Sequence, residues 1–167
     1  MTGVAASLLM LGGATLAGAA EPFVERVFIR DAFVAASVRA AREGALRRLA
    51  RPRCQAVFAD FRDERGRRLY ERLLELGQSG RDYFARIPFF DGADAKTCVE
   101  ARAIAFTSPG QRQVLVCGRV FHHVRQTEPR FSEAVLIHEA LHTLGLGEDP
   151  PSSREITRQV LKRCGWP

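Results

Sequence analysis

The stretch Glu133–Leu144 is apolar on nearly every side when its residues are placed about 100° apart around a helix. A helix without a polar face belongs in the interior of a domain, so the stretch predicts a buried central helix. Two of the four histidines in the chain, His138 and His142, leave one face of that helix about one turn apart. A buried imidazole without a partner costs about 1–3 kcal/mol. A divalent metal ion bound by both rings removes this cost, and zinc suits neutral imidazole.

Glu139 lies beside the histidine face, and the three residues form the pattern H-E-x-x-H, which is typical of zinc metallopeptidases. In such sites the glutamate is the general base, because it takes a proton from a water molecule that the zinc ion has made acidic. We therefore expect one zinc ion, with His138 and His142 as ligands and Glu139 as the catalytic residue. A catalytic zinc site also needs a third protein ligand and one open position.

The pattern continues through Gly145 and Glu148, and the whole motif, HExxHxxGxxE, resembles the metzincin signature HExxHxxGxxH. In metzincins the glycine allows a turn that brings the last residue of the motif to the metal ion. The resemblance implies that Glu148 is the third metal ligand, with the adjacent Asp149 as the alternative. The methionine turn of metzincins has no counterpart here, because no methionine follows Met10.

A fainter resemblance is to the deuterolysin-like aspzincins, which are secreted and have a disulfide-linked strand before the metal-binding helix. Val114–Phe121 is similar to that strand, whereas the GTxD-type motif that supplies their third ligand is absent from this sequence. The resemblances imply a small zincin of the α+β class. It would be rich in helices, with a short sheet or hairpin packed against the HExxH helix and two disulfides.

Residues 1–20 carry no charged side chain, contain a run of small and apolar residues, and end in alanine and glycine. This composition is typical of a secretory signal peptide. We expect residues 21–167 to form a single metallopeptidase domain of a secreted or periplasmic protein. Beyond residue 20, no apolar run approaches the roughly 20 residues that a membrane span requires.

The four cysteines are spread along the chain without a CxxC pair, so two disulfides formed in an oxidising compartment are the simplest interpretation. We favour the pairings Cys98–Cys117 and Cys54–Cys164. The second pairing would tie the C-terminal segment to the rest of the domain.

Apolar periodicity and capping signals predict several helices and one hairpin. The expected hairpin joins strands 101–107 and 113–117 through a turn at Pro109 and Gly110. If Thr107 pairs with Arg112, the Cys98–Cys117 bridge requires the chain to curl back before Ala101. Residues 87–92 are predicted to be a turn. The expected helices cover residues 31–50, 67–76, 79–84, 132–144 with Ser132 as the cap, and a last segment that begins with the capping box Ser152–Glu155.

The residue that stabilises the oxyanion during catalysis is not evident from the motif. Tyr70 and Tyr83 precede the motif, and no pattern places them near the metal ion. His122 and His123 are expected as an exposed pair on an edge strand, where they would point to opposite faces.

The net charge of +6 comes mainly from arginine. Acidic residues are interleaved with the arginines and no aromatic platform accompanies them, which argues against a nucleic-acid partner. The leading hypothesis is a monomeric zinc-dependent endopeptidase that acts on a peptide or protein substrate. The alternatives are a zinc-binding module without turnover, and a basic protein that binds anionic surface polymers.

Overall fold

The structure is a computed structural model that describes residues 25–100 and 103–165. The predicted signal peptide, residues 1–20, lies outside the described residues. The elements follow one another as β1 (Val27–Phe28), α1 (Ala32–Leu49), α2 (Pro52–Gln55), α3 (Val57–Asp60), α4 (Leu69–Glu75), α5 (Gly80–Ala85), β2 (Phe89–Asp91), α6 (Lys96–Glu100), β3 (Ala105–Phe106), β4 (Val114–Val116), α7 (Gly118–Thr127), α8 (Pro129–Thr143) and α9 (Ser153–Cys164).

The helices begin and end where local signals act on the backbone. The Asp31 carboxylate accepts hydrogen bonds from the second and third amides of α1, and Ser79 and Ser152 cap α5 and α9 in the same way. Ser152 and Glu155 form the predicted capping box. Four of the predicted helices therefore match α1, α4, α5 and α9 within a few residues.

In the described residues the strands form one sheet with the order β1-β2-β4-β3. The pairs β1–β2 and β2–β4 are parallel, whereas β3 and β4 form the predicted antiparallel hairpin. Its register differs from the expected one, because Ala105 lies opposite Val116 and Phe106 opposite Leu115. The turn predicted at residues 87–92 is wrong: Phe89–Asp91 is the inner strand β2. A strand of three residues is too short to show periodicity, and only its neighbours on both sides define it.

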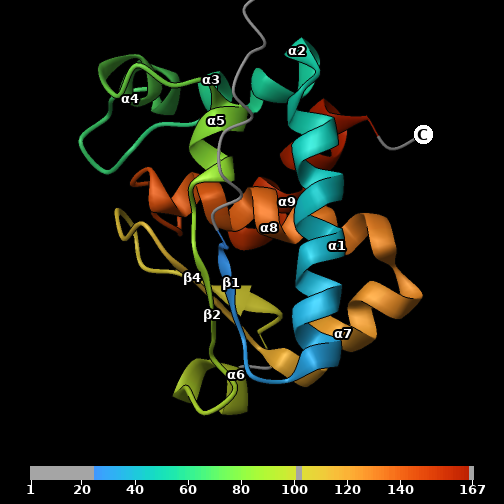
Figure 1. Cartoon of the computed structure of the whole chain (residues 1–167). Coiled ribbons are helices and arrows are strands. Elements are labelled where there is room, and N and C mark those ends of the chain that lie inside the picture. Colours follow the sequence, from blue (N-terminus) through green and yellow to red (C-terminus); the bar gives the residue numbers. More distant parts are fainter. Residues whose placement is uncertain (1–24, 101–102, 166–167) are drawn as a thin grey trace, which may run out of the picture.

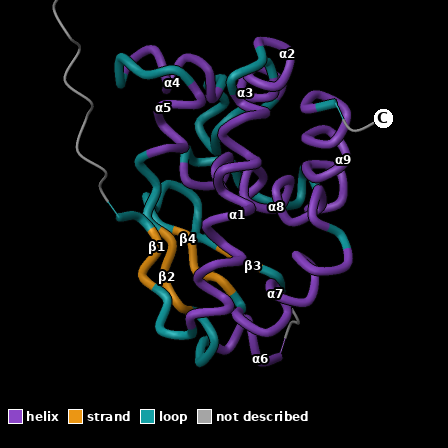
Figure 2. The backbone as a smooth tube through the Cα atoms, turned by 45° about the vertical axis from the view of Figure 1, so that its right-hand side comes forward, coloured by secondary structure: helices purple, strands orange, loops and turns teal. Residues whose placement is uncertain are grey.

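Helix α8 is the central helix and carries the HExxH motif. All residues from Ser132 to Thr143 are buried, and α1, α7, α9 and the strands β3 and β4 contact it. Figures 1 and 2 show α1 crossing α8, with the sheet beside them. The helix begins at Pro129 rather than after Ser132, whose hydroxyl instead donates to the carbonyl of Pro129 at 2.7 Å inside the first turn. Proline at the first position of a helix loses no hydrogen bond.

A buried ion pair fixes α8 against α1. The Glu133 carboxylate lies 2.6 Å from Nε of Arg48 and 3.9 Å from Arg125. Gly44 of α1 faces this carboxylate, and a Cβ atom at that position would collide with the Glu133 side chain. The absence of a side chain at Gly44 thus lets the two helices approach closely.

The strand expected at Val114–Phe121 ends at Val116, and the following residues form α7. His122 and His123 therefore lie on a helix and not on an edge strand, which corrects the prediction. Phe121 of α7 is completely buried, because the helix packs against α1 and α8. Burial of this helical face outweighs the strand propensity of the local sequence.

Both predicted disulfides are present, Cys54–Cys164 and Cys98–Cys117. The first joins α2 to the end of α9. The second spans a Cα–Cα distance of 5.2 Å because Cys98 lies on the short helix α6. A helix advances about 1.5 Å per residue against about 3.3 Å for a strand, so α6 supplies the required curl of the chain before Ala101.

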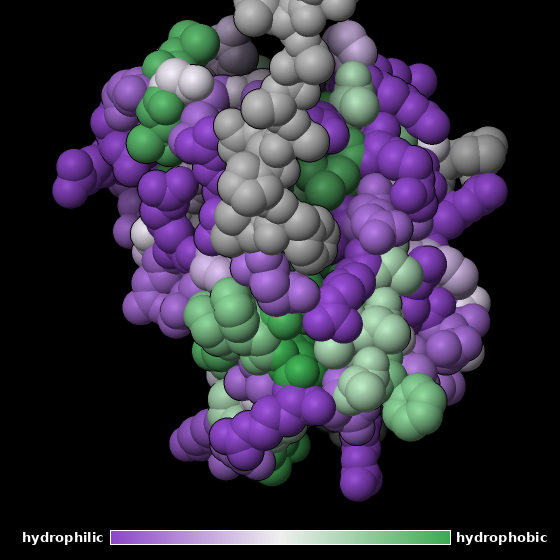
Figure 3. Space-filling view, in the orientation of Figure 1, coloured by the Kyte–Doolittle hydropathy of each residue, from purple (hydrophilic) through white to green (hydrophobic). Residues whose placement is uncertain are grey.

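The protein is thus an α+β structure, mostly helical with a small sheet, two disulfides and the hairpin against the motif helix. Its buried apolar residues form one core cluster. On the face drawn in Figure 3 hydrophilic side chains predominate, with an apolar cluster over β1 and β2, where Phe28 stacks on Phe90. None of the described helices is long and apolar enough to cross a membrane.

Candidate metal centre

Three of the side chains predicted from the motif converge at the end of α8. Nε2 of His138 lies 2.9 Å from Nε2 of His142. A carboxylate oxygen of Glu148 lies 3.2 Å from Nε2 of His142 and 3.6 Å from Nε2 of His138. The three groups can together hold a metal ion, whereas Asp149 is not part of this cluster.

A glycine turn brings Glu148 back to the histidines. Helix α8 ends at Thr143, and Gly145 adopts a φ of 105°. Residues other than glycine rarely adopt this backbone conformation. The carbonyl of Gly145 accepts a hydrogen bond from the amide of Glu64 at 3.2 Å, which holds the turn in place. The chain then reverses past the buried Leu146 and presents Glu148 to the two rings.

The outer nitrogen of each ring is hydrogen-bonded, which fixes the direction of the ring. Nδ1 of His142 lies 2.7 Å from the carbonyl of Leu146. Because a carbonyl only accepts, this nitrogen carries the proton and the Nε2 lone pair is left for a metal ion. Nδ1 of His138 lies 2.9 Å from the hydroxyl of Thr157 on α9.

Sequence reasoning missed both of these outer partners. Thr157 is next to Ile156, which is predicted to lie on the apolar face of the last helix. The apolar pattern does not indicate which other helix this face packs against. The capping box shows where α9 begins, and only its contact with α8 brings Thr157 to His138.

Burial shifts the protonation of the site. Desolvation, helped by the neighbouring His142, lowers the pKa of His138 to about 3, so the ring is in the neutral form that binds a metal ion. Burial also raises the pKa of Glu139 well above its usual value, and the nearby Glu148 acts in the same direction. A hydrogen bond from the Thr107 amide opposes this shift. The Glu139 carboxyl therefore binds a proton more readily than an exposed glutamate does.

A cavity of about 370 Å³ opens beside the three converging groups. Glu139, His142 and Glu148 line it. The other lining residues are small or uncharged: Thr97, Ala103, Ala105, Phe106, Thr107, Pro109 and Ser153. Since β3 is the edge of the sheet, the cavity lies between the motif helix and an edge strand. A buried carboxyl, a metal-binding group and space for a further molecule thus adjoin one another.

The other residues considered for oxyanion stabilisation lie elsewhere. Tyr83 is buried and donates to the Thr143 hydroxyl at 3.0 Å. His122 is hydrogen-bonded to Ser37 at 2.8 Å on the α1–α7 side. No tyrosine or second histidine joins His142 among the described residues that line the cavity.

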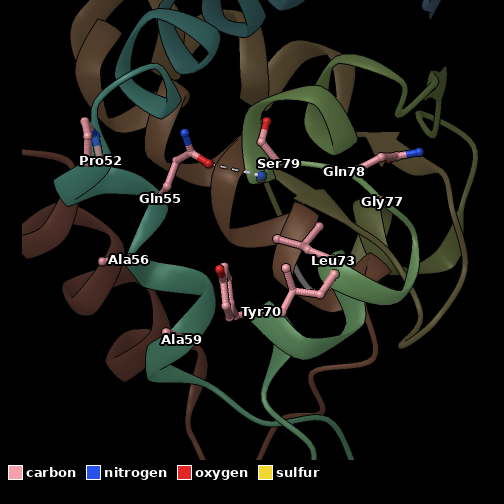
Figure 4. A pocket seen from close by; sticks show the side chains of 11 residues that line it. Pro52, Gln55, Ala56, Ala59, Tyr70, Leu73, Gly77, Gln78 and Ser79 are labelled. Carbon is pink, nitrogen blue, oxygen red and sulfur yellow. Dashed lines mark hydrogen bonds between the residues drawn. The ribbon is translucent and has the colours of Figure 1, made fainter.

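A larger cavity, of about 600 Å³, lies between α2–α3 and α4–α5 (Figure 4). Figure 4 shows Tyr70 and Leu73 of α4 opposite Ala56 and Ala59, with the Gln55 side chain bonded to the amide of Gly80. Its lining is mainly apolar and includes no residue of the metal-binding group. Size alone therefore does not mark the chemical site of this protein.

Comparison with known proteins adds no relative from which a role could be transferred: no family model, no curated protein and no solved structure matches the chain. The function can therefore be inferred only from the chemistry of the site itself.

Proposed function

We propose that this protein is a zinc-dependent endopeptidase whose catalytic residue is Glu139. The observation that supports it best is the convergence of His138, His142 and Glu148 at one point beside a cavity that Glu139 also lines. Two histidines and one carboxylate are an established ligand set of catalytic zinc sites.

The protein groups fit such an ion. Both histidine rings direct Nε2 toward the same point, and the outer hydrogen bond of His142 leaves its Nε2 unprotonated. The carboxylate of Glu148 supplies a negative charge and is half exposed, so the group is reachable from solvent. A bound zinc ion would supply a water molecule of lowered pKa and polarise the carbonyl of a peptide bond.

Glu139 would move the protons of the reaction. Its carboxyl can take a proton from the attacking water molecule and give it to the nitrogen of the departing amine. Glu139 follows His138 directly and lines the cavity, so its carboxyl would lie near a peptide bond bound there.

The edge strand β3 is suited to hold the substrate. A peptide bound in extended form beside an edge strand gains hydrogen bonds from the strand backbone, whatever its own sequence. A cavity between β3 and α8 would thus bind the middle of a substrate polypeptide and not only its end, as an endopeptidase requires.

We test this proposal with purified zinc-loaded protein and a mixed peptide library. The wild type should contain one zinc ion per chain and cleave peptides, whereas Glu139→Gln should keep the zinc and lose at least about 100-fold in kcat. Asp149→Asn is the matched control, because Asp149 is an acidic neighbour of Glu148 outside the cluster. Equal activity of the wild type and Glu139→Gln would refute the catalytic role and leave a zinc-binding module without turnover.

The proposed compartment is the periplasm or the extracellular space. Two disulfides are present, and such bonds persist in oxidising compartments. Expression of the full chain with mass spectrometry of the exported product should show a mature N-terminus near residue 21. A product that stays in the cytoplasm with an intact N-terminus would contradict export.

A further inference from the structure

We infer that the Cys98–Cys117 disulfide is a positioning element for the substrate: it holds the part of the cavity wall that Thr97, Ala103 and Ala105 line, and it has no part in holding the metal ion. This inference rests on the proposed function, since it assigns a role within the same cavity.

Helix α6 has little else to fix it. None of its residues is buried, and Val99 is 68% exposed. The one ion pair that the described residues show on this helix, Lys96–Glu100, joins two of its own exposed side chains. An exposed pair of this kind contributes little to stability. The bridge from Cys98 to the buried Cys117 is thus the main anchor of α6.

The bridge reaches the wall of the cavity through Thr97, and Cys117 also contacts the wall through its backbone. Thr97, next to Cys98, lines the cavity, so the bridge limits how far this side chain can move. The amide of Cys117 donates to the carbonyl of Ile104 at 3.0 Å, between the lining residues Ala103 and Ala105. One residue therefore ties α6 through its sulfur and the start of β3 through its backbone.

The metal-binding group is held by different contacts. His138 and His142 belong to α8, Glu148 follows the Gly145 turn, and their outer partners come from residues 146 and 157. The other disulfide, Cys54–Cys164, joins α2 to α9 and does not line the cavity. Loss of Cys98–Cys117 should therefore loosen the substrate wall without releasing zinc.

The two bridges also differ in access to solvent. Cys54 and Cys164 are each 1% exposed, whereas Cys98 is only partly buried. A water-soluble phosphine should thus reduce Cys98–Cys117 first, with the phosphine and one water molecule becoming the phosphine oxide and the two sulfurs becoming thiols. Phosphine treatment therefore opens the same bridge that substitution of both cysteines removes.

The experiment compares the wild type with the Cys98→Ala/Cys117→Ala variant, both zinc-loaded. We expect an unchanged zinc content and a KM at least about 10-fold higher, with a smaller change in kcat, because a displaced wall weakens substrate positioning. Val99→Ala is the matched control, as Val99 lies on the same helix but outside the cavity. Brief phosphine treatment of the wild type, with thiol alkylation to identify the opened bridge, should give the same rise in KM.

Hydrogen exchange provides a readout without activity. In the double variant the amides of α6 should exchange faster, while those of α8 should keep their protection. Unchanged KM or unchanged exchange in α6 would overturn the inference and leave the proposed function intact. Loss of zinc together with the bridge would also overturn it, because the bridge would then support the metal site. A wild type that binds zinc yet cleaves no peptide refutes the proposed function, and the inference with it.

Discussion

Acidification should destabilise the metal-free protein through His138, and the size of the effect follows from the burial of its ring. The pKa of His138 is about 3 in the folded chain against an ordinary value of 6.5. Between these values the unfolded chain binds a proton that the folded chain does not, so stability falls as the pH decreases. At pH 5 the loss amounts to about 2 kcal/mol relative to a histidine with an unshifted pKa, and at pH 7 it is close to zero.

Glu139 acts in the opposite direction and must be removed from the measurement. Its pKa is raised in the folded chain, so folding takes up a proton and the stability falls as the pH increases above the ordinary value of 4.5. The two groups oppose each other between pH 5 and 7. In the Glu139→Gln variant, His138 should be the one residue of this pair that still makes the free energy of unfolding depend on pH.

Urea unfolding of chelator-treated Glu139→Gln at pH 7 and pH 5 measures the effect. We expect the free energy of unfolding to be about 2 kcal/mol lower at pH 5. Adding His138→Gln in the same background should remove that difference, since glutamine does not titrate. Equal stability of Glu139→Gln at both pH values would show that His138 is not held neutral by burial, and the reasoning would fail.

Three further predictions concern the site and its support. Glu148→Ala should strongly weaken zinc binding in a competition titration, whereas Asp149→Ala should not; the reverse result would reassign the third ligand. Thr157→Val keeps the shape of the side chain but removes the hydroxyl beside Nδ1 of His138, so zinc affinity should fall by about 10–100-fold while the Tm stays nearly the same. Arg48→Met should lower the free energy of unfolding by about 3 kcal/mol, since it leaves the Glu133 carboxylate buried with only the more distant Arg125. A urea titration in which Arg48→Met unfolds like the wild type would contradict this reading of the ion pair.

The site residues on α8 can be predicted from the sequence because local helix geometry alone sets their arrangement. His138 and His142 are brought to one face by helical periodicity alone, and Gly145 ends the helix at a conformation that favours glycine. The structure brings Glu148 to these rings and leaves Asp149 aside. The two disulfides were expected from the number and spacing of the cysteines, although α6, which makes the Cys98 bridge possible, was not.

The errors share a different cause. Residues 87–92 look like a turn until β1 and β4 flank them, and residues 118–123 look like the rest of a strand until α1 and α8 cover Phe121. In each segment the local preference is weak, and contacts with distant parts of the chain decide the conformation.

By itself, the sequence determined the approximate bounds of α1, α4, α5 and α9 and the chemical types gathered in the HExxH helix. These features depend on residues within a few positions of one another, where capping and periodicity act. Only the tertiary structure decided which groups surround the site: the Thr157 hydroxyl, the Leu146 carbonyl, the Thr107 amide and the wall tied by Cys117. Those neighbours come from separate elements, and packing of the core, not local propensity, sets how such elements meet.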